Sequence, residues 1–241
     1  MTHRYLRPGW WIARLAGAAE NVLPPRWTIP VLAFASLLDG EPELRTLRQL
    51  VPRDQLAIDV GAAEGVYTWF LARYARRVVA FEANPASAAS VRRRIPRATM
   101  HTCALSDREG EAELRIPIVR GLPLTGWATV EPRNRHLTLA ADGYETIHVP
   151  MRTLDSVALE NVGFVKIDVE GHELAVLRGA EETLRRCRPV LLFEPDDHHC
   201  PGVVEAVRSF LGDLGYEMRP ARSAGMWVGK PVEVAMAGHA A

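Results

Sequence analysis

The sequence predicts an α/β fold in which helices cover both faces of a mostly parallel sheet. From about residue 54 onward, short apolar runs rich in β-branched residues alternate with segments of helical periodicity, the pattern of repeated strand–helix–strand units. The chain of 241 residues is 48% hydrophobic and 24% charged, so it can bury one substantial core. We therefore expect one α/β domain over residues 54–241, preceded by a helical extension over residues 1–53.

Local signals define the first elements of this alternation. Asn84 is a preferred N-cap residue and Pro85 takes the first helical position, where proline is best tolerated; Pro96 then ends the helix. Gly61 ends the first apolar run. We expect strands over residues 56–60, 78–82 and 99–105, and helices over residues 66–76 and 85–95.

The middle of the chain breaks the alternation. Residues 112–118 and 146–152 have the pattern of strands and predict a β-rich insertion after the third strand. Between them, residues 119–143 contain several glycines and prolines and no regular pattern. Long irregular segments inside compact domains are commonly functional, so we expect a substrate lid there.

The strand–helix alternation then resumes and continues to the end of the chain. We expect strands over residues 164–168 and 189–194, helices over residues 173–187 and 201–214, and a hairpin from residues 216–219 and 226–228. In the extension, helices are expected around residues 10–19, 27–38 and 41–50. Trp10, Trp11 and Trp27 are expected to be core or interface anchors, because no basic stripe accompanies them as in a nucleic-acid platform.

Charge and cysteine content argue against several classes of function. The 29 basic residues balance the 29 acidic ones, whereas nucleic-acid binding needs a concentrated positive surface. Three scattered cysteines without a Cys-x-x-Cys spacing indicate a reducing compartment. The longest apolar run, residues 31–38, is far shorter than the roughly 20 residues of a membrane span. We therefore expect a cytoplasmic protein that neither binds nucleic acid nor inserts stably into a membrane.

The bend after the first expected strand is a candidate binding site. It runs from Asp59 through Gly61 to Glu64 and Gly65 and opens into a helix with free N-terminal amides. A dinucleotide fingerprint, G-x-G-x-x-G, needs a second glycine where this chain has Ala63. The carboxylates of Asp59 and Glu64 would repel a pyrophosphate but tolerate the amino-acid group and sulfonium of S-adenosylmethionine. The bend therefore favours S-adenosylmethionine over NAD, with a ligand-free strand–helix turn as the alternative.

A carboxylate at the end of the second expected strand supports a nucleotide site. Glu82 lies 21 residues after Gly61, a spacing at which dinucleotide folds place an acid against the ribose hydroxyls. Parallel strands end at one edge of a sheet, so the bend and Glu82 are expected to face one crevice.

Titratable residues gather at the same expected edge and are the candidates for catalysis. Asp168 ends the fourth core strand, and Glu170 and His172 line the turn into the next helix. Glu194 ends the fifth strand, shortly before two histidines. Glu173 is interpreted as a first-turn acid that favours the helix N-terminus. Paired histidines on loops are more often solvated than bound to metal, so no metal site is expected.

Four blocks of sequence are distinctive together: IDVGAAEGVYT at residues 58–68, FEANP at 81–85, ALSDREG at 104–110, and RTLDS at 152–156 with KIDVEGHELAVLRGA at 166–180. In these blocks the chain resembles the FkbM family of S-adenosylmethionine-dependent methyltransferases. The last block is the most specific, whereas many methyltransferases share the first. Glu64 departs from the pattern, since such sequences often carry asparagine there.

The resemblance implies a class I methyltransferase sheet, which is Rossmann-like, with seven strands of which the last is antiparallel. Family contacts to the cofactor carry over onto Gly61, Ala62, Glu64, Tyr67 and Thr68 for the methionine part, and onto Glu82, Asn84, Ala104, Leu105 and Ser106 for the adenosine part. Family members are similar in methylating hydroxyl groups of sugars, polysaccharides, glycolipids or polyketide-type natural products. A small-molecule or glycan acceptor with a free hydroxyl is thus implied.

The expected activity is O-methylation, which needs a group that accepts the hydroxyl proton. Asp168 and Glu170 rank first for this role, His172 second and Glu194 third. Two other classes stay open: an NAD-dependent oxidoreductase, and a non-catalytic nucleotide-binding protein or membrane-surface partner that uses the Trp-rich N-terminus. Neutral charge makes RNA methylation a weaker option. The oligomeric state is also open, a homo-oligomer included.

Overall fold

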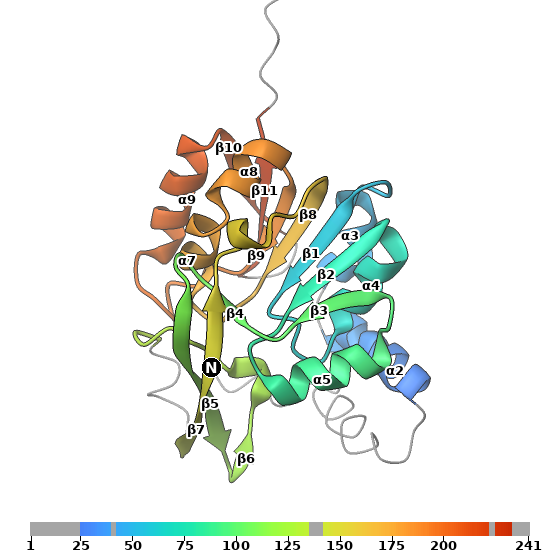
Figure 1. Cartoon of the computed structure of the whole chain (residues 1–241), viewed down its shortest axis with the longest axis vertical. Helices are drawn as coiled ribbons and strands as arrows, with labels where there is room; N and C mark the ends of the chain where they lie inside the picture. Colours follow the sequence, from blue (N-terminus) through green and yellow to red (C-terminus); the bar gives the residue numbers. More distant parts are fainter. Residues whose placement is uncertain (1–24, 40–41, 135–141, 222–224, 233–241) are drawn as a thin grey trace, which may run out of the picture.

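The computed structural model describes residues 25–39, 42–134, 142–221 and 225–232. The helix expected over residues 10–19, with Trp10 and Trp11, lies outside the described residues. Figure 1 shows a central sheet with helices on both faces and a smaller sheet beside it.

The central sheet has seven strands in the order β10-β11-β9-β8-β1-β2-β3. The strands are β1 (Leu56–Val60), β2 (Arg77–Phe81), β3 (Ala98–His101), β8 (Val162–Ile167), β9 (Val190–Phe193), β10 (Tyr216–Pro220) and β11 (Trp227–Pro231). Neighbouring strands from β3 through β9 run parallel, whereas β11 is antiparallel to both β9 and β10. The seven-stranded, mostly parallel sheet and its antiparallel last strand are therefore confirmed.

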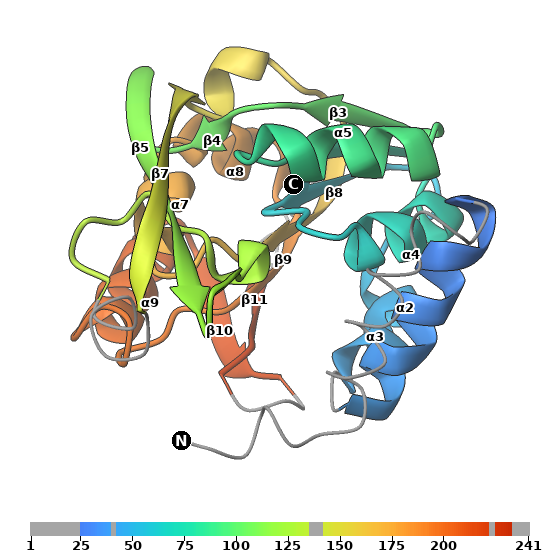
Figure 2. The same ribbon diagram turned by 90° about the horizontal axis from the view of Figure 1, so that it is seen from below.

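Two groups of helices cover the two faces of this sheet, as Figure 2 shows from below. One face carries α7 (Glu173–Arg178), α8 (Glu181–Cys187) and α9 (Val203–Asp213), and the other carries α2 (Pro25–Asp39), α3 (Glu43–Leu50), α4 (Val66–Tyr74) and α5 (Pro85–Arg94). Strand alternation divides the core: Ile58 and Val60 pack towards α7–α9, while Ala57 packs towards α3 and α4. Asn84 caps α5 as expected, with its side chain accepting the N–H of Ala86 at 2.9 Å.

The helices α2 and α3 share a core with the main domain. Ala33, Leu44 and Leu47 are buried in one cluster with Phe70 of α4. The division of the chain at residue 53 stays a prediction. Trp27 is 57% exposed, which excludes it from the core and leaves the interface interpretation. None of the helices in the described part of the chain combines the length and apolar character that crossing a lipid bilayer requires.

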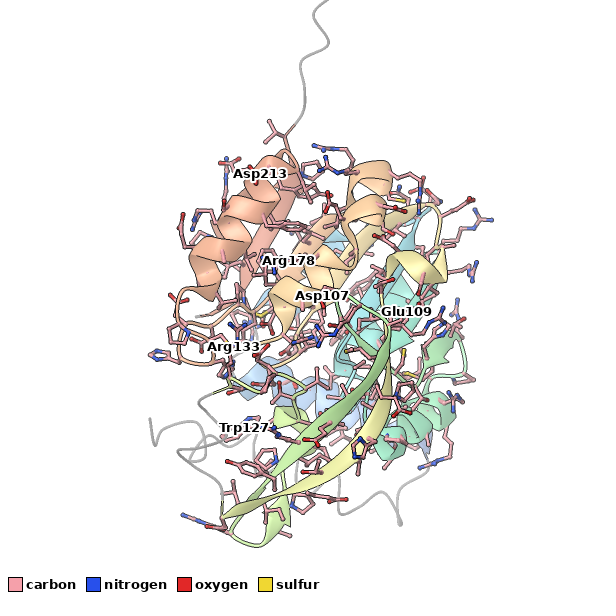
Figure 3. All side chains as sticks on the ribbon, turned by 60° about the vertical axis from the view of Figure 1, so that its left-hand side comes forward. Asp107, Glu109, Trp127, Arg133, Arg178 and Asp213 are labelled. Atoms are coloured by element: carbon pink, nitrogen blue, oxygen red, sulfur yellow. The ribbon has the colours of Figure 1, made fainter. Side chains whose placement is uncertain are left out.

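A second sheet is formed by the chain between β3 and β8. Its strands are β4 (Ala104–Leu105), β5 (Gly110–Val119), β6 (Leu122–Pro123) and β7 (Gly143–Arg152), in the order β4-β7-β5-β6. The segment expected to be irregular thus contains β6 and the 3-10 helix η3 (Thr125–Trp127), and Thr129 forms a bridge with Arg115 of β5. Figure 3 shows Trp127 beside this sheet.

The single third strand expected over residues 99–105 is wrong, because the chain changes sheet within it. Phe81 of β2 pairs with His101, whereas Ala104 pairs with Met151 of β7. The hydrogen-bond partners of this run therefore come from two different sheets.

The single helix expected over residues 173–187 is also wrong. The chain forms α7 and α8, broken at Gly179, where a Cβ atom would lie 1.9 Å from the backbone oxygen of Ser106. The carboxylate of Asp155, in the 3-10 helix η4 (Asp155–Val157), caps α8 by accepting the N–H groups of Glu182 at 3.0 Å and Thr183 at 2.8 Å. Contacts with residues that are distant in the sequence therefore end α7 and begin α8.

Candidate active site

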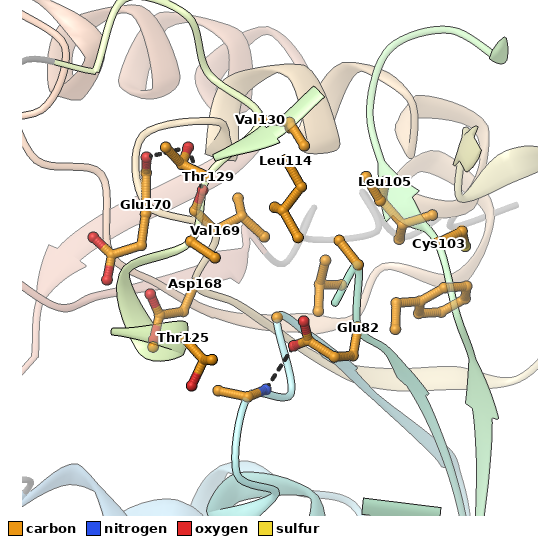
Figure 4. A pocket seen from close by; sticks show the side chains of 18 residues that line it. Glu82, Cys103, Leu105, Leu114, Thr125, Thr129, Val130, Asp168, Val169 and Glu170 are labelled. Carbon is orange, nitrogen blue, oxygen red and sulfur yellow. Dashed lines mark hydrogen bonds between the residues drawn. The ribbon is translucent and has the colours of Figure 1, made fainter. Parts of the chain in front are cut away.

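A pocket lies where the carboxyl edge of the central sheet meets the second sheet (Figure 4). The hollow spans about 590 Å³ of space, which includes open solvent at its mouth. One wall comes from the ends of β1, β2 and β8, and another from β4, β5, η3 and the segment after η3. Its lining residues are Val60, Gly61, Ala63, Phe81, Glu82, Ala83, Cys103, Ala104, Leu105, Leu114, Thr125, Gly126, Ala128, Thr129, Val130, Asp168, Val169 and Glu170.

Gly61 allows three strand ends to approach each other beside this pocket. Its φ is +77°, and a Cβ atom there would lie 1.9 Å from the backbone oxygen of Asp168. Its N–H donates to the carbonyl oxygen of Phe81 at 2.9 Å. A side chain would push the bend after β1 away from the end of β8, so glycine is required here.

Glu82 at the end of β2 has the geometry of a ribose-binding acid. Its Oε2 accepts the N–H of Ala63 at 2.7 Å, and its Oε1 accepts the N–H of Asn84 at 2.8 Å. Burial raises the pKa of Glu82, and these two N–H groups act in the opposite direction. A carboxylate oxygen has a second lone pair, so each can also accept a hydroxyl of a ribose. The bend and this acid therefore fit an adenosine-containing cofactor.

A buried polar network supports the bend from below. Lys166 is 3% exposed; its Nζ donates to the Gly61 carbonyl oxygen at 2.9 Å and lies 3.5 Å from carboxylate oxygens of both Asp59 and Asp168. Thr68 donates its hydroxyl to Asp59. The ring of Tyr67 lies 4.9 Å from the same ammonium group. Burial raises the pKa of Asp59, and Lys166 opposes this.

The predicted cofactor residues fall into two groups. Gly61, Glu82, Ala104 and Leu105 line the pocket. The others lie outside its lining, in the network below it, in the bend or on the flanking elements: Asp59, Ala62, Glu64, Gly65, Tyr67, Thr68, Asn84 and Ser106. Their direct contact with the cofactor stays a prediction.

Asp168 and Glu170 both line the pocket but differ in orientation. The Asp168 side chain is 34% exposed and lies between Glu170 and Thr125 in Figure 4. The carboxylate of Glu170 points away from Glu82 in the same view, and its Oε2 lies 3.5 Å from Nε2 of His199. Asp168 is therefore the better placed of the two for proton transfer.

His172 and Glu194 lie off this pocket. Nε2 of His172 is 2.9 Å from the hydroxyl of Ser106, and Nδ1 is 3.1 Å from Oε2 of Glu131, so both ring nitrogens have partners within the protein. His172 lines a neighbouring pocket beside β5. Glu194 lies beside Gly225, next to the turn that joins β10 and β11. The geometry ranks both below Asp168.

Glu173 holds the turn that presents Asp168. It is fully buried, and its Oε1 accepts the N–H groups of Val169 at 3.2 Å and Gly171 at 3.1 Å. Burial raises its pKa from 4.5 to about 7. The interpretation of Glu173 as a first-turn acid therefore misses its contact with the site.

Sequence reasoning missed Lys166. This residue carries a signal, since it is a charged residue inside an apolar strand and one of only two lysines in the chain. The wall formed by Thr125 and Thr129 lies inside the segment 119–143 that is expected to be a substrate lid, and its role as a lid stays a prediction. No periodicity in the segment singles out these two threonines. Thr129 is fixed by tertiary contacts: its hydroxyl donates to the carbonyl oxygen of Glu170 at 2.8 Å.

The sheet order, the antiparallel β11 and a pocket closed by an acid at the end of β2 define a class I methyltransferase fold. Residues 59–218 match the methyltransferase FkbM domain family. The chain belongs to that family, and its cofactor is S-adenosylmethionine.

A solved structure of an FkbM methyltransferase agrees with this fold. A methyltransferase FkbM from Methylobacillus flagellatus KT is 14% identical, with a TM-score of 0.51; the match covers 92% of this chain and 58% of that one. The present chain thus spans little more than half of that relative's length. A putative methyltransferase from Streptococcus mutans in complex with SAH is 14% identical, with a TM-score of 0.46, over 79% of this chain and 96% of that one. Among curated proteins, no sequence matches significantly.

Proposed function

We propose that this protein is an O-methyltransferase whose acceptor is a neutral, hydroxyl-rich small molecule or glycan, such as a sugar, a glycolipid or a natural product. The observation that carries the proposal is the position of Asp168. It lies in the pocket, near the two wall threonines, and is anchored from behind by Lys166. A carboxylate so placed can accept the proton of an alcohol.

The charge of the pocket lining supports an uncharged acceptor. Three carboxylates, those of Glu82, Asp168 and Glu170, line it, and no arginine or lysine does so among the described residues. These carboxylates would repel an acceptor that carries a phosphate or carboxylate group. The hydroxyls of Thr125 and Thr129 are instead suited to neutral polar groups. These observations favour a sugar-like acceptor over RNA.

The chain's own residues have two tasks in the reaction. When bound, S-adenosylmethionine supplies an electrophilic methyl group on a sulfonium. The pocket walls would hold the acceptor hydroxyl in a fixed orientation; oriented reactions gain up to about 7–11 kcal/mol in favourable cases. Asp168 would accept the proton that this hydroxyl loses when its oxygen is methylated, a contribution of about 10²–10⁴-fold in rate.

A screen with labelled S-adenosylmethionine tests the acceptor class. Neutral sugars and glycosides, their phosphorylated forms, and RNA are offered separately. We expect label to pass to the oxygen of a neutral compound. Transfer only to RNA or to phosphorylated compounds would contradict the proposal.

Asp168→Asn tests the proposed base. We expect kcat to fall at least about 100-fold, with the Kd for S-adenosylhomocysteine within a few-fold of wild type, because only proton transfer is lost. Glu170→Gln is expected to lower kcat less than tenfold, since its carboxylate points away from Glu82 and lies 3.5 Å from Nε2 of His199. Asp213→Asn, exposed on α9 (Figure 3), is the control. Wild-type turnover in Asp168→Asn would remove this residue from the mechanism.

A further inference from the structure

Helix α2 exposes an apolar face to solvent. Trp27, Val31 and Phe34 are 57%, 36% and 61% exposed, and their i, i+4, i+7 spacing places them on one stripe. The opposite side of the helix, with Ile29 and Leu32, is buried. The sequence has no charged residue between Arg26 and Asp39. A surface helix normally carries polar residues on its outer face, so this stripe is unusual.

Arginines are concentrated on helices α4 and α5, which contact α2, and at the amino ends of β2 and β3. Residues 65–102 contain seven arginines and a single acid, Glu82, which is buried in the pocket. Six of the seven are exposed: Arg73, Arg76, Arg77, Arg92, Arg93 and Arg97. Among the described residues, only Arg73 and Arg92 of these six have hydrogen-bond acceptors, and no carboxylate pairs with any of them. The loop between α3 and β1 contains Arg53 and Asp54, whose charges cancel, so it does not change the net charge of this region.

The stripe and the arginines lie on segments that pack against one another or adjoin one another. Ile29 of α2 packs in one cluster with Val91 and Ile95, which flank the last turn of α5 where Arg92 and Arg93 lie. Both views of the molecule show α2 alongside α4 and α5 (Figures 1 and 2). We name this surface the arginine–apolar face: Trp27, Val31, Phe34, Arg73, Arg76, Arg77, Arg92, Arg93 and Arg97.

We infer that the arginine–apolar face docks on an anionic lipid surface. Aromatic and aliphatic side chains on one helix stripe insert at a bilayer interface, while nearby arginines bind the anionic headgroups. The 26 residues up to the start of the stripe have the same composition, with four arginines, one acid and two tryptophans.

Charge favours a lipid surface over two other occupants. In a twofold dimer the same face meets itself, which would bring the two arginine clusters together. RNA would bind the arginines but gives no role to Val31 or Phe34. The pocket opens at the carboxyl edge of the sheet, whereas Arg77 and Arg97 lie at the amino ends of β2 and β3. Docking therefore leaves the pocket free.

Vesicle co-sedimentation of the full chain tests this inference. We expect binding to vesicles of equimolar phosphatidylglycerol and phosphatidylcholine, weaker binding to phosphatidylcholine alone, and loss of binding as salt rises. The pair Arg92→Gln/Arg93→Gln should lower the partition coefficient about fivefold for each arginine removed. Its matched control is Arg185→Gln/Arg186→Gln, two exposed arginines in the last turn of α8.

A second variant tests the apolar stripe separately. Trp27→Ser/Phe34→Ser changes only exposed side chains and should lower binding to the anionic vesicles at least tenfold, with an unchanged melting temperature. Tyr144→Ser, which removes an exposed aromatic ring on β7, is the control and should bind like wild type. Three results would overturn the inference. The wild-type protein fails to bind anionic vesicles, the α2 and α5 variants both bind them as tightly as wild type does, or the protein forms a concentration-dependent dimer that these variants abolish.

Discussion

Lys166 joins three segments of the candidate active site. Its ammonium group is almost fully buried against the carboxylates of Asp59 and Asp168 and the carbonyl oxygen of Gly61. A buried charge is tolerated when ion pairs and hydrogen bonds surround it. Because these partners belong to β1, to the bend after it and to the residue after β8, one side chain fixes the cofactor bend relative to Asp168.

The raised pKa of Glu173 predicts that the stability of the fold depends on pH. Its folded-state pKa of about 7 lies above its ordinary value of 4.5. Protonated Glu173 therefore contributes its full stabilisation to the fold below pH 4.5. This stabilisation is lost as the pH rises through about 7. At about 1.4 kcal/mol per pH unit, this gap corresponds to roughly 3 kcal/mol of unfolding free energy.

Glu173→Gln keeps an oxygen acceptor but cannot ionise. We expect the unfolding free energy of the variant to decline less with rising pH than that of wild type, across the window from 4.5 to about 7. Urea unfolding at a series of pH values measures this difference. Glu205→Gln, an exposed first-turn acid on α9, should follow wild type. Identical pH slopes for wild type and Glu173→Gln would refute the account.

At the scale of elements, the break between α7 and α8 depends on Asp155. Its carboxylate accepts two backbone N–H groups of α8 and the hydroxyl of Thr183. We expect Asp155→Ala to lower the unfolding free energy by about 1–2 kcal/mol, and Asp155→Asn by less, since asparagine retains one acceptor oxygen. Thermal denaturation checks this, with Asp213→Ala as the exposed control. A loss no greater than that of the control would show that α8 needs no cap.

The elements that could be predicted are those whose signals are local. Asn84 and Pro85 are enough to start α5, and the apolar runs of the parallel strands have no helical alternative. The break at Gly179 is different, because a glycine in a helical pattern costs only about 1 kcal/mol and its close neighbour, Ser106, is far away in sequence. The change of sheet near Cys103 likewise depends on strands that come later in the chain.

The candidate site was predictable along the edge of the central sheet. Gly61, Glu82 and Asp168 each follow a parallel strand, so the rule that ligands lie at the carboxyl edge brings them together. The opposite wall lies in the segment expected to be a substrate lid, but its pocket residues could not be named from the sequence, because Thr125 and Thr129 reach the pocket only through contacts of the second sheet.

At the scale of the whole molecule, the pocket has two walls. The central sheet together with β4 supplies the residues expected to hold the cofactor, and η3 with the segment after it supplies the wall expected to face the acceptor. We therefore expect that acceptor specificity can change through η3 and this segment without altering the cofactor bend.

The most direct test is calorimetric titration with S-adenosylhomocysteine. We expect wild type to bind one equivalent and NADH to give no heat. Glu82→Gln should weaken binding about 10- to 100-fold, the worth of a hydrogen bond to a charged group, while Glu217→Gln on β10 should bind like wild type. Unchanged affinity in Glu82→Gln would place the nucleoside elsewhere and contradict the account.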